Sequence, residues 1–73
     1  MRVTVNGEER ELPEGITLEA LIGQLMLAPD RLAIERNREV VRRADWPRTT
    51  LSEDDRVEII HFVGGGARVL EDN

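Results

Sequence analysis

The segment that most constrains the fold is an apolar run near the C-terminus, "RVEIIHFV" at 56–63, which three glycines follow at 64–66. Its β-branched residues and short length predict an extended strand. Side chains of a strand alternate between its two faces. One face therefore carries Val57, Ile59 and His61, and the other carries Glu58, Ile60 and Phe62. A strand covered on one face is normally polar on the other. Here the second face is apolar near its end, so we expect a small exposed apolar patch there.

The composition predicts one small globular domain. The chain has 73 residues, of which 40% are hydrophobic, so one modest core is possible. It has no cysteine, which excludes disulfides, thiolate zinc sites and a cysteine nucleophile. The net charge of −5 and the lack of a basic stripe argue against nucleic-acid binding. With no apolar run of membrane-spanning length and an early polar start, the sequence indicates a cytoplasmic protein without a membrane partner.

The N-terminal part predicts a hairpin and then a helix. Residues 2–6 and 8–13 alternate in polarity around Asn6-Gly7, a pair that tight hairpin turns prefer because both residues tolerate positive φ. Thr17 is a favourable N-cap for a helix over 17–27, which Pro29 would end. The apolar residues of this helix recur at one-face spacing: Leu18, Leu21, Ile22 and Leu25.

The remaining chain predicts three more strands. Residues 31–37 and 39–43 read as strands, 44–55 as a connection with one helical turn, and 56–62 as the last strand. The order β-β-α-β-β-β predicts an α+β fold in which one main helix packs on one face of a mixed sheet of four to five strands. With the last strand inserted beside the first, this is the β-grasp (ubiquitin-like) fold. We expect a domain over 1–63 and a flexible glycine-rich tail over 64–73.

The sequence offers no catalytic or metal site of its own. His61 is the only histidine, and without cysteine it lacks partners for zinc. The acidic run Glu53-Asp54-Asp55 lacks the alternating ligands and glycine of a calcium loop, so a solvated turn is expected. No two carboxylates are paired for acid–base chemistry. The chain is therefore not expected to be an enzyme.

The glycines can be interpreted in two ways. No lysine is present for a phosphate-binding loop, and a triple glycine is commonly a flexible linker. Alternatively, Gly64, Gly65 and Gly66 thread a narrow channel of another protein, where chemistry is done at a backbone carboxyl. The apolar strand before the glycines favours this second interpretation. Ile60, Phe62 and Val63 are then the expected docking residues for the partner.

Several motifs resemble one known family. The segments "AIERNREVV" at 33–41, "DRVEI" at 55–59 and "HFVGGG" at 61–66 resemble the ThiS family of sulfur carriers of thiamin thiazole biosynthesis, in the MoaD–ThiS superfamily. The resemblance covers residues 1–66, and it rests on the order of these motifs, the spacing between them and the total length. The related small subunits of molybdopterin synthase share the fold and a Gly-Gly end.

The resemblance implies a carrier that binds no cofactor itself. An E1-like adenylating enzyme (ThiF-like or MoeB-like) would use ATP to adenylate the carboxylate of Gly66. A sulfur donor would convert the adenylate to a thiocarboxylate, which would give sulfur to a thiazole synthase (ThiG-like). Gly64 and Gly65 would complete the tail.

Family carriers typically end at the double glycine, so we expect a peptidase to remove residues 67–73. Three alternatives share these features. One is a sulfur carrier for molybdopterin or cysteine synthesis, and another is a ubiquitin-like protein modifier joined through Gly66. The third is an interaction module that keeps its tail.

Overall fold

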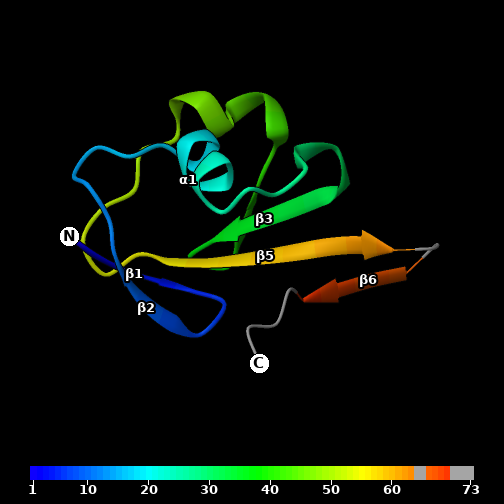
Figure 1. The fold of residues 1–73 in the computed structure, drawn as a ribbon, viewed down its shortest axis with the longest axis horizontal. Coiled ribbons are helices and arrows are strands. Elements are labelled where there is room, and N and C mark those ends of the chain that lie inside the picture. The colour runs from blue at the N-terminus through cyan, green and yellow to red at the C-terminus, as the bar shows by residue number, and fades with distance from the viewer. Residues whose placement is uncertain (64–65, 70–73) are drawn as a thin grey trace.

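The structure is a computed structural model that describes residues 1–63 and 66–69, and for residues 63 and 66–69 it describes the backbone alone. Six strands form one sheet: β1 (Arg2–Val5), β2 (Glu8–Glu11), β3 (Leu32–Arg36), β4 (Glu39–Val41), β5 (Arg56–Val63) and β6 (Gly66–Val69). The helical elements are α1 (Leu18–Gln24) and the 3-10 segments η1 (Pro29–Arg31) and η2 (Arg43–Arg48). These helical elements lie together on one side of the sheet (Figure 1).

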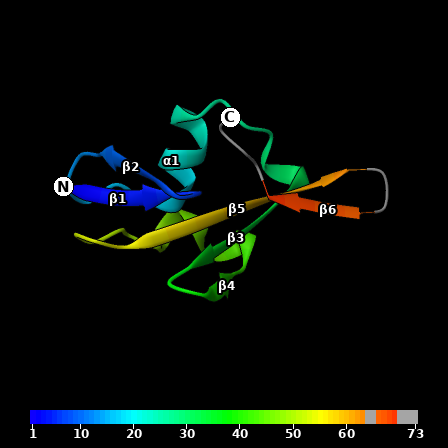
Figure 2. The same ribbon diagram turned by 90° about the horizontal axis from the view of Figure 1, so that it is seen from below.

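The sheet is mixed and is organised around β5. Its strand order is β2-β1-β5-β3-β4, with β6 paired to β5 outside this path. The central strand β5 is parallel to β1 and antiparallel to β3, and Figure 2 shows it crossing the molecule between them. The prediction of a β-grasp fold, with one main helix on one face and the last core strand beside the first, is confirmed.

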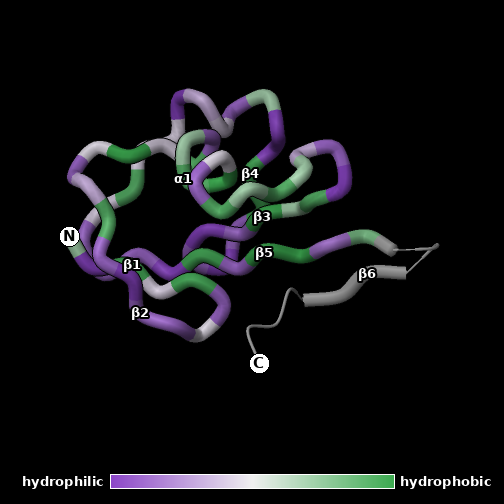
Figure 3. The backbone as a smooth tube through the Cα atoms, viewed as in Figure 1, coloured by the Kyte–Doolittle hydropathy of each residue, from purple (hydrophilic) through white to green (hydrophobic). Residues whose placement is uncertain are grey.

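The core lies between the sheet and α1. Val3 of β1, Ile34 of β3 and both Val57 and Ile59 of β5 are buried, and Leu18 and Leu21 of α1 belong to the same cluster with no exposed surface. Figure 3 shows this apolar material along β1, β5 and α1. Trp46 of η2 joins the core while its indole N–H donates a hydrogen bond to the carbonyl of Val41 at 2.9 Å. A buried indole thus keeps its donor satisfied.

The helix begins as predicted and ends earlier. The hydroxyl of Thr17 accepts a hydrogen bond from the N–H of Ala20 at 3.1 Å, which caps the helix N-terminus. The helix stops at Gln24, three residues before the predicted end. Met26 takes a left-handed conformation with φ of 60°, which reverses the chain as a C-terminal cap does.

The structure places a sixth strand, β6, where the sequence predicted a flexible tail. Residues 66–69 pair antiparallel with the end of β5. The physical reason is that β5 runs past the end of β1 and leaves an edge on which a further strand can form hydrogen bonds. Gly64, Gly65 and residues 70–73 lie outside the described residues, so flexibility there stays a prediction.

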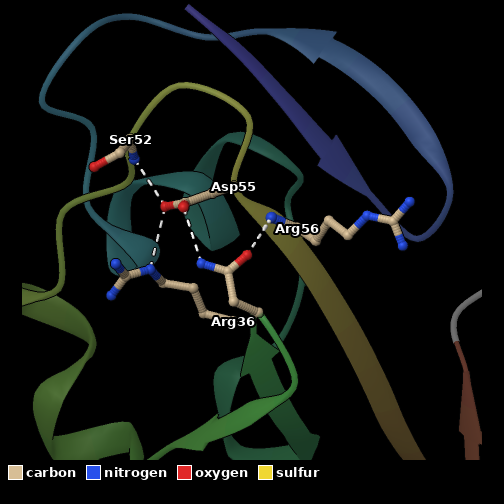
Figure 4. A network of polar contacts seen from close by, with 5 residues as sticks. Arg36, Ser52, Asp55 and Arg56 are labelled. Carbon is tan, nitrogen blue, oxygen red and sulfur yellow. Dashed lines mark hydrogen bonds and ion pairs between the residues drawn. The ribbon is translucent and has the colours of Figure 1, made fainter.

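A buried carboxylate fixes the start of β5. Asp55 is 7% exposed, although the sequence predicted a solvated turn over 53–55. Its Oδ2 accepts hydrogen bonds from the N–H of Ser52 at 2.8 Å and from Nε of Arg36 at 3.1 Å. Its Oδ1 accepts one from the side chain of Asn37 at 3.0 Å. Asn37 in turn accepts the N–H of Arg56 at 2.9 Å, which ties the β3–β4 turn to β5 (Figure 4).

These contacts keep Asp55 ionised. Burial alone raises the pKa of Asp55, but the hydrogen bonds from Asn37 and Ser52, with the charge of Arg36, outweigh it and lower the pKa below the ordinary 3.8. Because the pKa is lower in the folded state, the carboxylate contributes stability above the pKa of the unfolded chain. That contribution is lost as pH falls through the pKa of the folded state.

We predict that Asp55→Asn lowers the free energy of unfolding by about 2 kcal/mol at neutral pH, because donors that faced a carboxylate lose their acceptor. The difference from wild type shrinks as pH falls below 3.8. Urea denaturation at a series of pH values measures it. Asp54→Asn is the matched control, since Asp54 is exposed and asparagine tolerates its φ of 70°. A pH-independent difference between wild type and Asp55→Asn would contradict the assignment.

Candidate functional site

The predicted site lies at the C-terminal end of the central strand. The last residue of β1, Val5, pairs with Val57, so β5 continues beyond β1 for six further residues. On the other edge, β3 accompanies β5 as far as the pair Leu32 and His61. The end of β5, which leads to the glycines, therefore extends beyond both neighbouring strands, β1 and β3.

Asn6 closes the gap that β1 leaves beside β5. Its N–H donates to the carbonyl of Val57 at 2.9 Å, and its side-chain Oδ1 accepts the N–H of Ile59 at 2.7 Å. Its Nδ2 also approaches the carbonyl of Ile59, at 3.5 Å. The side chain thereby acts like one more residue of β1. The sequence predicted Asn6 only as a turn residue, because nothing local distinguishes an amide that also bonds a strand 53 positions away.

Two of the predicted docking residues, Ile60 and Phe62, lie on the face of the sheet that points away from α1. Ile59 is buried toward the core, so Ile60 and Phe62 project to the opposite face. Ile60 is half-buried beside Ala33 of β3, while Phe62 is 47% exposed. The predicted distribution of these side chains between the two faces is confirmed. For Val63 the structure places only the backbone, and partner binding by these three residues stays a prediction.

His61 lies on the inner face and borders an open hollow of about 430 Å³ with η1 residues. Asp30 and Arg31 line it, and Phe62 borders it at the end of β5. A second hollow of about 420 Å³ lies between α1 and η2 and shares no lining residue with the first. The two hollows are therefore separate features of the surface.

The described residues limit the chemistry of this site. Among them, no group of three or more histidine or carboxylate side chains could hold a metal ion. No helix in the described part of the chain is long and apolar enough to cross a membrane. Of the predicted reactive end, the structure places Gly66, whose backbone begins β6 opposite Val63. Gly64 and Gly65 lie outside the described residues.

These features define a class: a ubiquitin-like domain whose central strand leads directly into a run of glycines. The model of one family, described as the ThiS family, matches residues 3–66. The match covers most of the chain and ends at Gly66. The chain therefore belongs to the ThiS family, as the sequence motifs predicted.

Individual proteins agree with this assignment. A thiazole synthase from Magnetococcus marinus is 44% identical over 66 residues, which is 90% of this chain and 20% of that protein. The sulfur carrier protein ThiS of Bacillus subtilis is 34% identical over 50 residues, or 68% of this chain and 76% of that protein. The crystal structure of a thiamine biosynthesis protein (ThiS) from Geobacter metallireducens superposes with a TM-score of 0.80. It is 33% identical, with 90% of this chain and 100% of that chain covered.

We predict that Phe62 and Ile59 differ sharply in their effect on stability, because they lie on opposite faces of β5. Ile59→Ala should lower the free energy of unfolding by about 3 kcal/mol, since Ile59 is 1% exposed. Phe62→Ala should cost about 1 kcal/mol or less, since nearly half of that side chain is already in water. Urea denaturation of both variants measures this. Equal losses would contradict the outer-face assignment of Phe62.

Proposed function

We propose that the chain is a sulfur carrier for thiamin thiazole synthesis, with sulfur carried as a thiocarboxylate at Gly66. The observation that carries this proposal is that the family match runs from residue 3 to Gly66 and stops there. Gly66 follows the central strand β5 in the sequence. That strand pairs with β3 and contributes the buried residues Val57 and Ile59 to the core. The reacting carbonyl is thus tethered to a rigid domain by a short segment without side chains.

The chemistry requires an unhindered carboxylate. Glycine has no Cβ, so no side chain of Gly66 crowds its carbonyl, and glycine tolerates a wide range of backbone conformations. An adenylating enzyme would join this carboxylate to the α-phosphate of ATP and release pyrophosphate. A sulfur nucleophile would then displace AMP from the acyl adenylate and leave a thiocarboxylate. In these steps the chain is the carrier and the substrate, and the adenylating enzyme and the sulfur donor supply the catalytic groups.

The proposed partners are an E1-like adenylating enzyme and a thiazole synthase. Support for the synthase comes from the Magnetococcus relative, in which a segment similar to this chain makes up 20% of a protein named thiazole synthase. Joining a carrier and a synthase in one polypeptide would raise the effective concentration of the carrier at that synthase. This favours thiazole synthesis over molybdopterin or cysteine synthesis as the destination of the sulfur. These steps would take place in the cytoplasm.

Residues 67–73 must leave before Gly66 can react. While Ala67 is attached, Gly66 has an amide and not a carboxylate. We propose that a peptidase removes the seven residues after Gly66. The half-exposed Phe62, with Ile60 beside it, would then form the docking face for the adenylating enzyme.

The proposal predicts that a chain ending at Gly66 supports exchange of labelled pyrophosphate into ATP by the adenylating enzyme, whereas residues 1–73 do not. The reason is that only the shorter chain presents a glycine carboxylate. Pyrophosphate exchange measures adenylation before any sulfur chemistry. Introducing Gly66→Val in the shorter chain should lower the rate by at least about tenfold through bulk beside the carbonyl.

Phe62→Ala provides the control for docking in the same assay. It should raise the concentration of carrier needed for half-maximal exchange and leave the maximal rate unchanged, since it does not touch the reacting group. Equal exchange by the two chain lengths would rule out Gly66 as the activated residue.

A further inference from the structure

One edge of β5 changes partner along its length. The N–H and C=O groups of successive residues in a strand point to alternate edges. The carbonyl of Val57 and the N–H of Ile59 both face the β1 side, where Asn6 bonds them. The carbonyl of Arg56 faces the other side, where it accepts the N–H of Asn37 at 2.7 Å. This alternation places the backbone groups of His61 on the β1 side, beyond the reach of β1.

That part of the edge is occupied by β6. The register pairs Val63 with Gly66, Phe62 with Ala67 and His61 with Arg68. Because β3 pairs with His61 along one edge of β5, β6 lies along the other edge. This is the same edge that β1 and Asn6 occupy nearer the start of β5. Figures 1 and 2 both show β6 beside the last part of β5. By the same alternation, His61 and Arg68 form a hydrogen-bonded pair, whereas Ile60 and Val69 do not.

The pairing includes the bond that maturation must break. Gly66 and Ala67, on either side of that bond, are both members of the β5–β6 ladder. Peptidases bind their substrates as extended segments whose backbone groups are free to pair with the enzyme. A segment already paired within a sheet has first to separate from it.

The separation of β6 is expected to be local. It involves four residue pairs on a single edge, and a two-stranded pairing of this kind is only marginally stable. The amide of Asn6 holds Ile59 independently of β6, so loss of β6 leaves the pairing of β1 with β5 in place. Among the side chains that the structure describes, the buried core residues also precede position 60.

We propose that β6 is a latch: while residues 66–69 pair with the edge of β5 at His61 and Val63, the Gly66–Ala67 bond is withheld from hydrolysis. This inference rests on the proposed maturation after Gly66. In the open state water adds to the carbonyl carbon of Gly66, and the bond to the nitrogen of Ala67 breaks. The products are the Gly66 carboxylate and the amine of Ala67. The rate of maturation then depends on how often β6 separates.

The test compares two proline variants of the 73-residue chain. Arg68→Pro removes an N–H that faces His61, while Val69→Pro removes one that faces away from β5. Amide hydrogen exchange measured by NMR should be at least about tenfold faster at His61 in Arg68→Pro than in wild type, and near wild type in Val69→Pro. The amides of Ile59 and Ile60 are internal controls, because Asn6 and β3 respectively keep them paired. Equal exchange of His61 in wild type and Arg68→Pro would overturn the latch.

A second readout monitors cleavage itself with subtilisin, a protease of broad specificity, and intact mass. Each cleavage rate in the tail is divided by the rate for the same chain unfolded in urea, which removes the direct effect of proline on the protease. Arg68→Pro should raise this ratio by about tenfold over wild type and Val69→Pro should not. Equal ratios for the three chains would overturn the proposal.

Neither readout involves the adenylating enzyme, so the two proposals can fail separately. A protected His61 in a chain whose tail persists in its native host would reject maturation after Gly66 and leave the strand pairing intact. Conversely, an unprotected His61 in a chain that is cleaved and activated would reject the latch and leave the carrier function intact.

Discussion

The rest of the structure depends on how the central strand is held, and hydrogen bonds to two polar side chains hold it. Asp55 fixes the start of β5 through donors from the β3–β4 turn and the preceding loop. Asn6 fixes its middle by pairing with Ile59 where β1 has ended. A buried carboxylate and an amide that pairs with the strand edge specify the register through directional hydrogen bonds, which apolar packing does not supply. With register fixed, Ile60 and Phe62 are held on the outer face.

Much of the fold could be predicted because its signals are local. Alternation in β1, β3 and β5, helical spacing in α1 and the pair Asn6-Gly7 each indicate an element without knowledge of distant residues. The prediction of a solvated turn at Asp55 is wrong because the donors that bury this side chain come from positions 18 and 19 residues earlier. No local pattern reports such a partner.

The C-terminal segment is a second place where the local sequence does not predict the pairing of a strand. Three glycines predict an unpaired tail by composition, yet β6 pairs with β5 because the sheet offers an open edge. That edge exists only because β1 is shorter than β5, which is a property of the assembled sheet. The glycine residues fit both arrangements, since a short connection between paired strands and an unhindered chain end both favour residues without a side chain.

The domain therefore combines a stable scaffold with a weakly held end. Within the described side chains the buried core precedes position 60, whereas the segment after it contains the half-exposed Phe62, the three glycines and the short strand β6. Under the proposed carrier function, this division would let β6 separate from β5 while the scaffold stays folded.

The most direct measurement is the intact mass of the protein from its native host, before and after treatment with iodoacetamide. The chain has no cysteine, so rapid alkylation reports a thiocarboxylate and not a side-chain thiol. Alkylation also separates sulfur-for-oxygen exchange from methionine oxidation, which adds nearly the same mass. The account predicts a chain that ends at Gly66 and takes up one alkyl group. A chain that still ends at Asn73 and does not react would contradict it.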